Sequence, residues 1–272
     1  MKIFETHTHY DDERFGEDRA SLLNSMEAHG IAPIINVGST LEGARMSLLL
    51  AKEYPFVYAA IGVHPSDIET LTDGGEIPGD PHERGLDWIR EHASDPRVVA
   101  IGEIGLDYYW EKDEEVRRQQ RHYFRRQLAI AREADLPVII HSREACEDTL
   151  FILKEAVALG TRGVMHCYSY SPEIAEEYVK MGFYLGVGGV ITFKNARKLK
   201  ETVQRVPLSS LVVETDCPYL APEPFRGQRN ESTYLPYVVQ AISKLRELTE
   251  EQVISETAKN ARRLFAKAEY RS

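Results

Sequence analysis

The segment Lys2-Ile3-Phe4-Glu5-Thr6-His7-Thr8-His9 is an apolar β run that ends in two histidines. Later apolar runs also end in side chains that can bind a metal ion, and these are Glu103, His141, His166 and Asp216. Parallel strands of an α/β barrel bring their carboxyl ends to one mouth, where such side chains would meet. The repeated pattern therefore indicates a barrel that collects metal ligands, as a metal-dependent hydrolase does.

Eight β runs are predicted along the chain. They cover residues 2–7, 32–37, 57–64, 98–103, 137–141, 163–166, 183–188 and 211–216. Uninterrupted apolar runs of this kind are typical of strands buried on both faces, as parallel strands are. Amphipathic helical patterns lie between the runs, and no linker, repeat or low-complexity segment divides the chain. We therefore predict an α/β fold, a (β/α)8 TIM-type barrel that forms a single domain over residues 1–272.

Two of the predicted helices have clear start signals. Asp113 is a suitable N-cap for a helix whose apolar face includes Tyr123, Phe124 and Gln127. The opposite face is rich in arginine, which could suit nucleic acid, but interleaved glutamates and a place on the outer ring favour a solvated surface. Thr249 and Gln252 form a capping box that predicts a last helix running to about residue 268.

Composition limits the class of protein. The chain has 272 residues, of which 43% are hydrophobic and 28% charged, as in ordinary globular proteins. No apolar stretch reaches the roughly 18 residues of a membrane-spanning helix, so we expect no membrane partner and a cytoplasmic location. Three cysteines without a CxxC pair fit reduced thiols. Cys167 and Cys217 directly follow His166 and Asp216, and strand alternation is expected to turn both cysteine side chains outward into packing. A net charge of −10 argues against a broad electrostatic grip on nucleic acid, so any such contact must be local to the site.

Five of the nine histidines fall at or just beyond predicted strand ends, and they are His7, His9, His64, His141 and His166. One histidine in such a place is more often a core residue than a ligand. Five of them, joined by Glu103 and Asp216, favour a metal site. His7 and His9 share one side of their strand because side chains alternate with a period of two.

The number of candidate ligands predicts two divalent metal ions. The set exceeds what one tetrahedral ion with an open position needs, and it comprises His7, His9, Glu103, His141, His166 and Asp216. Glu103 is suited to bridge the ions because a carboxylate has two oxygens. Asp216 is suited to bind an ion and to accept a proton from the attacking water.

A loop of residues 218–230 follows the eighth run. Arg226 and Arg229 offer forked donors in this proline-rich segment, and Asn230 lies beside them. Loops after the last strands of a barrel commonly bind phosphate, so these three residues are predicted substrate contacts. The alternative is that the two arginines are solvated surface residues. A metal pair that faces arginine donors would point to a phosphoester.

Six short motifs carry a resemblance to a known family. They are Glu5-Thr6-His7-Thr8-His9, Gly62-Val63-His64-Pro65, Gly102-Glu103-Ile104-Gly105-Leu106-Asp107, His141-Ser142-Arg143, His166-Cys167-Tyr168 and Glu214-Thr215-Asp216-Cys217-Pro218-Tyr219-Leu220, followed by the loop of residues 226–230. In this order they make the chain resemble the TatD-related deoxyribonuclease family, within the metal-dependent amidohydrolase-like barrels. The resemblance covers nearly the whole chain.

The resemblance implies a TIM-type barrel that hydrolyses nucleic-acid phosphodiester bonds with divalent ions, often as a 3′-to-5′ exonuclease. It implies substrates with nucleic-acid ends, either single-stranded DNA or RNA, and it puts His64 near the substrate. It places the family's metal ligands on His7, His9, Glu103, His141, His166 and Asp216. Family members are usually regarded as magnesium enzymes, whereas a histidine-rich set suits zinc or manganese better, so we expect Mg, Mn or Zn.

One position departs from the family pattern. The first motif of the family normally opens with aspartate, and this chain has Glu5. The extra methylene moves the carboxylate relative to the first metal or its supporting residues. Weakened occupancy of one metal, or an altered metal preference, is the resulting hypothesis.

Two other functions and one loop stay open at this point. Another barrel hydrolase, acting on a lactone, ester or amide, would often use a lysine at the end of the fourth strand, where this chain has Glu103. A quality-control binding protein with a vestigial site fits poorly with fully populated ligand positions. Residues 67–85 follow the third strand and are either a flap over the site or a surface loop. The sequence leaves the oligomeric state open.

Overall fold

The computed structural model describes residues 2–71 and 84–270. Eight parallel strands pair in sequence order: β1 (Ile3–Thr8), β2 (Ile31–Val37), β3 (Val57–Ile61), β4 (Val98–Asp107), β5 (Val138–Arg143), β6 (Gly163–Met165), β7 (Tyr184–Val187) and β8 (Leu211–Val213). Backbone hydrogen bonds join β1 to the segment after β8, from His9 N to Cys217 O at 2.8 Å and from Asp216 N to His7 O at 3.0 Å. The eight strands thus form a nearly closed barrel, and the predicted TIM-type fold is confirmed.

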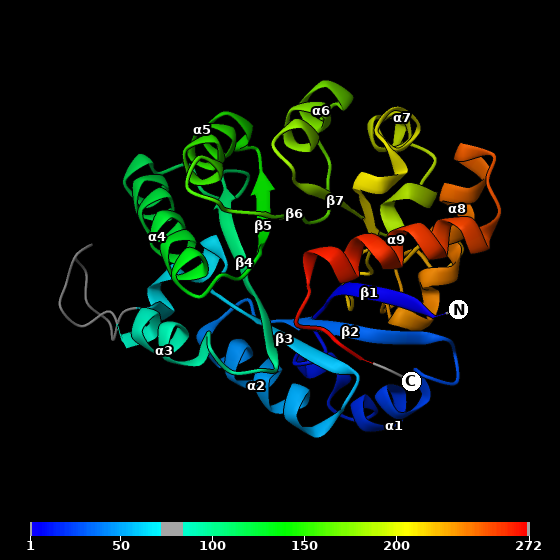
Figure 1. Cartoon of the computed structure of the whole chain (residues 1–272), viewed down its shortest axis with the longest axis horizontal. Helices are drawn as coiled ribbons and strands as arrows, with labels where there is room; N and C mark the ends of the chain where they lie inside the picture. Colours follow the sequence, from blue (N-terminus) through cyan, green and yellow to red (C-terminus); the bar gives the residue numbers. More distant parts are fainter. Residues whose placement is uncertain (1, 72–83, 271–272) are drawn as a thin grey trace.

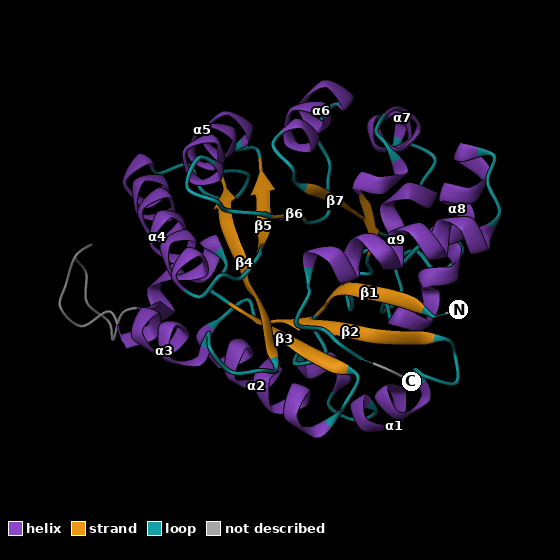
Figure 2. Ribbon diagram, viewed as in Figure 1, coloured by secondary structure: helices purple, strands orange, loops and turns teal. Residues whose placement is uncertain are grey.

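Helices alternate with the strands and surround them (Figure 1). Their bounds are α1 (Arg19–Ser25), α2 (Leu41–Glu53), α3 (Arg84–His92), α4 (Glu114–Glu133), α5 (Cys146–Val157), α6 (Pro172–Lys180), α7 (Arg197–Arg205), α8 (Leu235–Arg246) and α9 (Glu250–Leu264). Figure 2 shows the strands inside this ring of helices, as the buried apolar runs require.

The strands differ from the predicted runs mainly at their carboxyl ends. β4 continues past Glu103 to Asp107, which adds a polar side chain to the site. β3 ends at Ile61 and β8 ends at Val213, so His64 and Asp216 belong to the loops that follow rather than to the strands. His9 and His166 likewise follow β1 and β6, which end at Thr8 and Met165. All eight predicted strands exist, but four of the site residues lie in the backbone just beyond them.

Helix α4 positions two parts of the site through buried glutamines. Its predicted N-cap is confirmed, since the Asp113 side chain accepts a hydrogen bond from Glu115 N. The side-chain amide of Gln127 pairs with both backbone groups of Val63, beside His64, at 2.8 and 3.1 Å. Gln120 accepts a hydrogen bond from the backbone N–H of Asp107 at 3.0 Å. The face of α4 that was predicted to pack in the core therefore also hydrogen-bonds to the backbone at the mouth of the barrel, at Val63 and Asp107.

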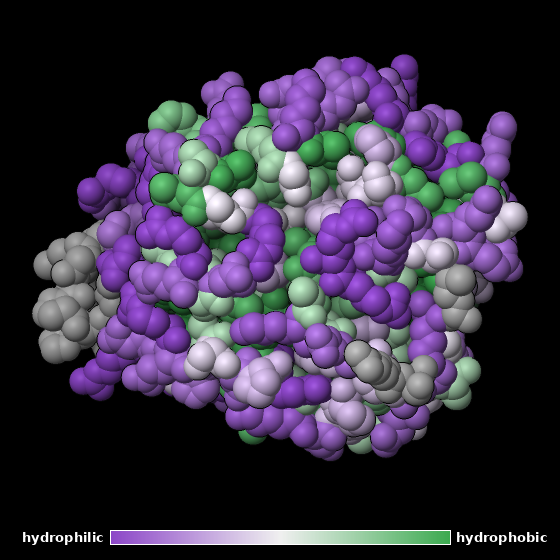
Figure 3. Space-filling model, in the orientation of Figure 1, coloured by the Kyte–Doolittle hydropathy of each residue, from purple (hydrophilic) through white to green (hydrophobic). Residues whose placement is uncertain are grey.

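The outer surface is polar. Arginines on the exposed face of α4 pair with acids, for example Arg118 with Glu115 and Arg125 with Glu155. This pairing fits the predicted solvated face. Figure 3 shows hydrophilic side chains over most of the face that it draws, with apolar ones visible between them. Within residues 2–71 and 84–270, no helix is both long enough and apolar enough to cross a membrane.

The end of the chain and the predicted flap complete the comparison. The capping box of Thr249 and Gln252 opens α9, as predicted, but the helix ends at Leu264 instead of near residue 268. Of the predicted flap over residues 67–85, positions 72–83 lie outside the described residues. Its ends belong to a 3-10 helix (Pro65–Leu71) and to α3.

Candidate metal centre

The predicted ligands converge at the mouth of the barrel. A cavity of about 430 Å³ is walled by His9, His64, Glu103, His141, His166 and Asp216, among others. His7 lies beneath it, fully buried. Segments more than 200 positions apart in sequence thus contribute to one polar cavity, as the common direction of the strands requires.

Glu103 stands at the centre of this cluster, and its two oxygens face different histidines. Oε2 lies 3.5 Å from His7 Nε2 and 3.7 Å from His9 Nε2. Oε1 lies 2.8 Å from His141 Nδ1 and 3.5 Å from His166 Nε2. The carboxylate therefore separates two groups of nitrogen donors, which is the arrangement that a bridging ligand needs.

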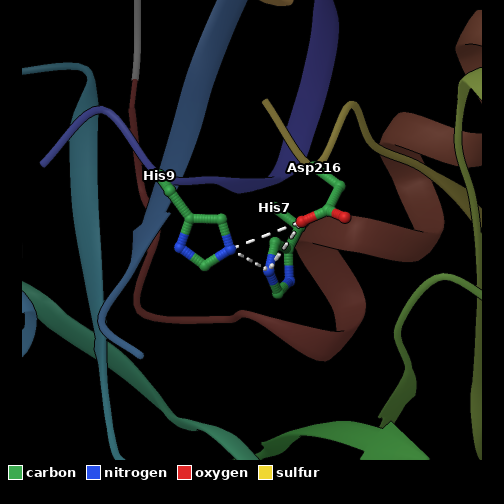
Figure 4. Close-up of side chains that lie close together, drawn as sticks. All are labelled: His7, His9 and Asp216. Carbon is green, nitrogen blue, oxygen red and sulfur yellow. Dashed lines mark hydrogen bonds and ion pairs between the residues drawn. The ribbon is translucent and has the colours of Figure 1, made fainter. Parts of the chain in front are cut away.

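The first group of donors has the spacing of a tetrahedral metal site. Figure 4 shows that His7 in β1, His9 just after it, and Asp216 after β8 point toward one another. The Nε2 atoms of His7 and His9 are 3.1 Å apart, and Asp216 Oδ1 lies 3.8 and 3.4 Å from them. A tetrahedral ion with bonds of about 2.1 Å separates its ligand atoms by about 3.4 Å. The donors, together with Glu103 Oε2, fit such an ion.

The second group of donors also satisfies the geometry of a metal site. Glu103, His141 and His166 place their ligand atoms within 4.8 Å of one another. His9 and His141 have supporting partners: His9 Nδ1 lies 2.8 Å from the carbonyl of Val37, and His141 Nε2 lies 3.2 Å from Asp107 Oδ2. Such partners orient the imidazole rings of metal-binding histidines.

Charge in the cluster is balanced by proton uptake on the histidines. Burial lowers the pKa of His9, but the carboxylates of Asp216 and Glu103 outweigh it and raise the pKa to about 9. Burial also lowers the pKa of His166, but the carboxylates of Glu214, Glu103 and Asp216 outweigh burial and raise this pKa to about 10. Burial acts against ionisation of Glu103 too, yet the facing histidines hold its pKa well below its usual range. The carboxylates are ionised, and an incoming cation must compete with protons on the imidazoles.

His64 differs from the other histidines of the cavity. Burial and the neighbouring charge at His141 lower its pKa to about 3, so the ring is neutral at pH 7. Its Nδ1 accepts a hydrogen bond from Ser66 N at 3.1 Å, which leaves the proton on Nε2. Nε2 lies 3.9 Å from Glu103 Oε1 and can act as a donor within the cavity.

Glu5 is placed away from the ligand atoms and supports Asp216 indirectly. Its oxygens accept hydrogen bonds from the backbone N–H and the hydroxyl of Thr215, at 2.9 and 2.8 Å. Asn230 Nδ2 donates to the carbonyl of the same Thr215 at 2.9 Å. These contacts hold Thr215, the residue before Asp216, in place. Asp216 itself has a φ of 59°, in the left-handed region that non-glycine residues rarely adopt. Glu5 also accepts a hydrogen bond from the backbone N–H of His7 at 3.3 Å, so an effect of glutamate in place of aspartate would reach the metals through Thr215 or through His7.

Tyr219 of the loop of residues 218–230 lines the cavity, but Arg226, Arg229 and Asn230 are not among the residues that line it. Arg229 forms a bidentate ion pair with Asp18 at 2.8 and 2.6 Å and packs over the ring of Phe15. Arg226 is exposed and lies over the ring of Phe193. Both hydrogen-bonding atoms of the Asn230 amide are used by backbone groups. Substrate contact by these three residues stays a prediction, and Asn230 has the positioning role described above.

Three residues at the site were not predicted as part of it. Asp107 is four positions from Glu103 on β4, and this even spacing was the signal that the two share a side of the strand. Glu214 lies 3.1 Å from His166 Nδ1. Cys167 was expected to point into packing by strand alternation. Because β6 ends at Met165 and Cys167 has a φ of 44°, its sulfur instead lies within 4.8 Å of ligand atoms of His166 and Asp216.

Comparison with known proteins agrees with this geometry. The family model described as TatD related DNase matches residues 4–266. The chain is 44% identical, over 97% of its length and 98% of the relative's, to the uncharacterized metal-dependent hydrolase YabD of Bacillus subtilis (strain 168). It is 35% identical, over 97% of each chain, to the metal-dependent hydrolase TatD of Mycobacterium tuberculosis.

A solved structure gives the same result in three dimensions. The crystal structure of the TatD homologue YJJV from Escherichia coli K12 superposes with a TM-score of 0.86 at 32% identity. The match covers 97% of this chain and 98% of that one. The barrel, the convergent donors and these relatives lead to one conclusion: the chain belongs to the TatD related DNase family and is a metal-dependent hydrolase.

Proposed function

We propose that the protein hydrolyses phosphodiester bonds at nucleic-acid ends, with two divalent ions bound at the mouth of the barrel. The first ion is held by His7, His9, Glu103 and Asp216, and the second by Glu103, His141 and His166. The observation that carries this proposal is the central place of Glu103, whose oxygens face two separate groups of imidazoles. The DNase family supports the choice of a nucleic-acid substrate.

The ions, when bound, would lower the pKa of water and neutralise charge on the phosphoryl oxygens. Magnesium, manganese and zinc are the candidates, and the donor set, rich in imidazole, suits zinc or manganese. Ligand spacing near a tetrahedron in the first group supports the same choice.

Asp216 is the proposed proton acceptor. Burial opposes its ionisation, but the charges of His166 and the hydrogen bond from His9 hold its pKa below its usual range, so it is ionised at neutral pH. Its side chain keeps 15% exposure and lines the cavity, so water can reach it. His64 is the proposed substrate contact, because its neutral ring presents an N–H in the cavity at pH 7.

The test is release of nucleotides from single-stranded DNA with magnesium, manganese or zinc. Glu103→Gln and Asp216→Asn are expected to abolish the release, since each removes a charged ligand. Glu155→Gln on α5 removes an exposed carboxylate that pairs with Arg125, and it should leave the rate unchanged. Strand polarity follows from end-labelled substrates, for which we expect 3′-to-5′ degradation.

A panel of small esters and lactones should run beside this assay. Absence of nucleotide release with all three metals, together with hydrolysis of a panel compound, would replace the nuclease with another metallohydrolase. Inactivity on every substrate would favour a binding protein with a vestigial site.

A further inference from the structure

The mouth of the cavity carries an exposed aromatic group that the proposed metal ligands do not use. Tyr109 and Trp110 follow β4 and are 43% and 72% exposed. Their rings meet edge to face, with centroids 4.6 Å apart. The guanidinium of Arg143, the last residue of β5, lies 3.9 Å from the centre of the Tyr109 ring and 5.5 Å from that of Trp110. These three residues are called the aromatic platform below.

The platform stands beside the catalytic cavity. Trp110 and Arg143 line the same cavity as Glu103 and Asp216. In the strand order of the barrel, β4 and β5 lie opposite β1 and β8. His7 lies in β1, and His9 and Asp216 lie just after β1 and β8. A substrate held over the metal ligands would therefore meet the platform on one side.

Two features of the platform fit a ligand better than a structural role. A large indole left in water contributes little to the core, and exposed aromatic surface beside a cavity commonly marks a binding site. Among residues 2–71 and 84–270, no carboxylate forms an ion pair with Arg143, whereas Arg229 and Arg14 are each held by an aspartate. The Tyr109 ring contacts the guanidinium of Arg143, and within the described part of the chain the guanidinium donors have no hydrogen-bond partner.

Charge alone cannot hold a nucleic acid at this mouth. The chain carries a net charge of −10, and Asp11, Asp12 and Asp67 line the same cavity. Stacking of bases on aromatic rings needs no such charge and works for every base, because each has a flat π face. Bases within a duplex are already stacked on one another, so an open ring selects unpaired bases.

We propose that the aromatic platform stacks an unpaired nucleobase of a single-stranded nucleic acid next to the bond that is cut. Trp110 supplies the stacking face, and Arg143 donates to a phosphate or to the base edge. This inference rests on the proposed nuclease function and names the part of the substrate that the chain recognises: the base, without regard to sequence.

The test compares Trp110→Ala with wild-type protein, loaded with manganese, on two strands. One is oligothymidylate, and the other has the same backbone with abasic tetrahydrofuran residues at the cleaved end. We expect the KM for oligothymidylate to rise about tenfold, because the variant loses the stacking of one base. The KM for the abasic strand should stay unchanged. Phe151→Ala is the matched control, because Phe151 is 61% exposed with Arg125 5.9 Å from its ring, on α5 away from the cavity.

A binding measurement keeps this inference separate from the proposed function. The chain has two tryptophans, so Trp88→Phe leaves Trp110 as the only indole, and its fluorescence should be quenched by oligothymidylate but not by the abasic strand. Quenching without cleavage would refute the proposed nuclease function and would still support stacking of a base on the aromatic platform. An unchanged KM in Trp110→Ala, an equal loss on both strands, or absence of quenching would overturn the platform.

Discussion

Glu5 offers a quantitative test of how the buried site is built. Burial raises the pKa of this carboxyl to about 8, against an ordinary value of 4.5, and hydrogen bonds from Thr215 and His7 only partly offset the burial. The folded protein therefore holds a proton on Glu5 at pH 7 that the unfolded chain releases. A group with a raised folded pKa contributes stability that is complete below the unfolded pKa, here 4.5, and is lost as the pH rises toward 8.

The magnitude follows from the size of the shift. Each pH unit within the window lowers the free energy of unfolding by about 1.4 kcal/mol, so the loss between pH 4.5 and pH 8 is about 4–5 kcal/mol. Glu5→Gln keeps the length of the side chain and an acceptor for Thr215 N–H, but it cannot ionise. We expect the stability of the variant relative to wild type to increase by about 4 kcal/mol from pH 5 to pH 8.

The assay is urea unfolding of metal-free protein, followed by circular dichroism at pH 5, 6, 7 and 8. Differences between variant and wild type cancel the titration of other groups. Glu155→Gln controls for removal of an exposed carboxylate and should give a difference that does not change with pH. Parallel pH profiles of wild type and Glu5→Gln would show that the carboxyl ionises at its ordinary pKa, and the argument from burial would be refuted.

Three further predictions concern the site. Metal binding at pH 7 should release at least two protons, because His9 and His166, with pKa values of about 9 and about 10, must become neutral to bind an ion, and the pKa of His141 is also raised, against the effect of burial, by Asp107 and Glu103. Metal affinity should rise with pH up to about 10, and calorimetric heats that do not depend on the buffer would contradict this. Gln127→Leu leaves both backbone groups of Val63 unpaired, so chemical unfolding should show a loss of about 2–4 kcal/mol, against no loss for Gln240→Leu on an exposed face. Glu5→Asp should change the metal content, which anomalous scattering can count. Identical metal occupancy and activity in the variant and the wild type would refute the hypothesis that Glu5 weakens one metal site or alters the metal preference.

The proposed ligands were predictable because they follow simple rules of β structure. Apolar runs ending in His7, Glu103 and His141 are local patterns, and the shared direction of parallel strands brings their ends together. The helix caps at Asp113 and Thr249 are equally local. Such features depend on a few neighbouring residues, so the sequence alone suffices to find them.

The arginine loop and Cys167 show where this reasoning stops. Arg229 pairs with Asp18, which is more than 200 positions away in the sequence, and its contact with substrate stays a prediction. The sequence of the loop has no periodic pattern that could predict the pairing of Arg229 with Asp18. Cys167 was expected to follow strand alternation, but its strand has already ended and its backbone turns into the left-handed region. Strand ends and loops have no fixed period, so side-chain directions there depend on contacts with the rest of the chain.

The eight-stranded barrel, the identity of the converging polar residues and the family resemblance could be predicted from the amino-acid sequence, because they depend on periodicity and on the order of motifs. The three-dimensional arrangement was needed to show that Glu103 divides its two oxygens between separate histidines, that Glu5 binds Thr215, and that Trp110 is exposed at the mouth. The reason is that distances and partners between strands arise from barrel closure, which brings together residues with no local relation in the chain.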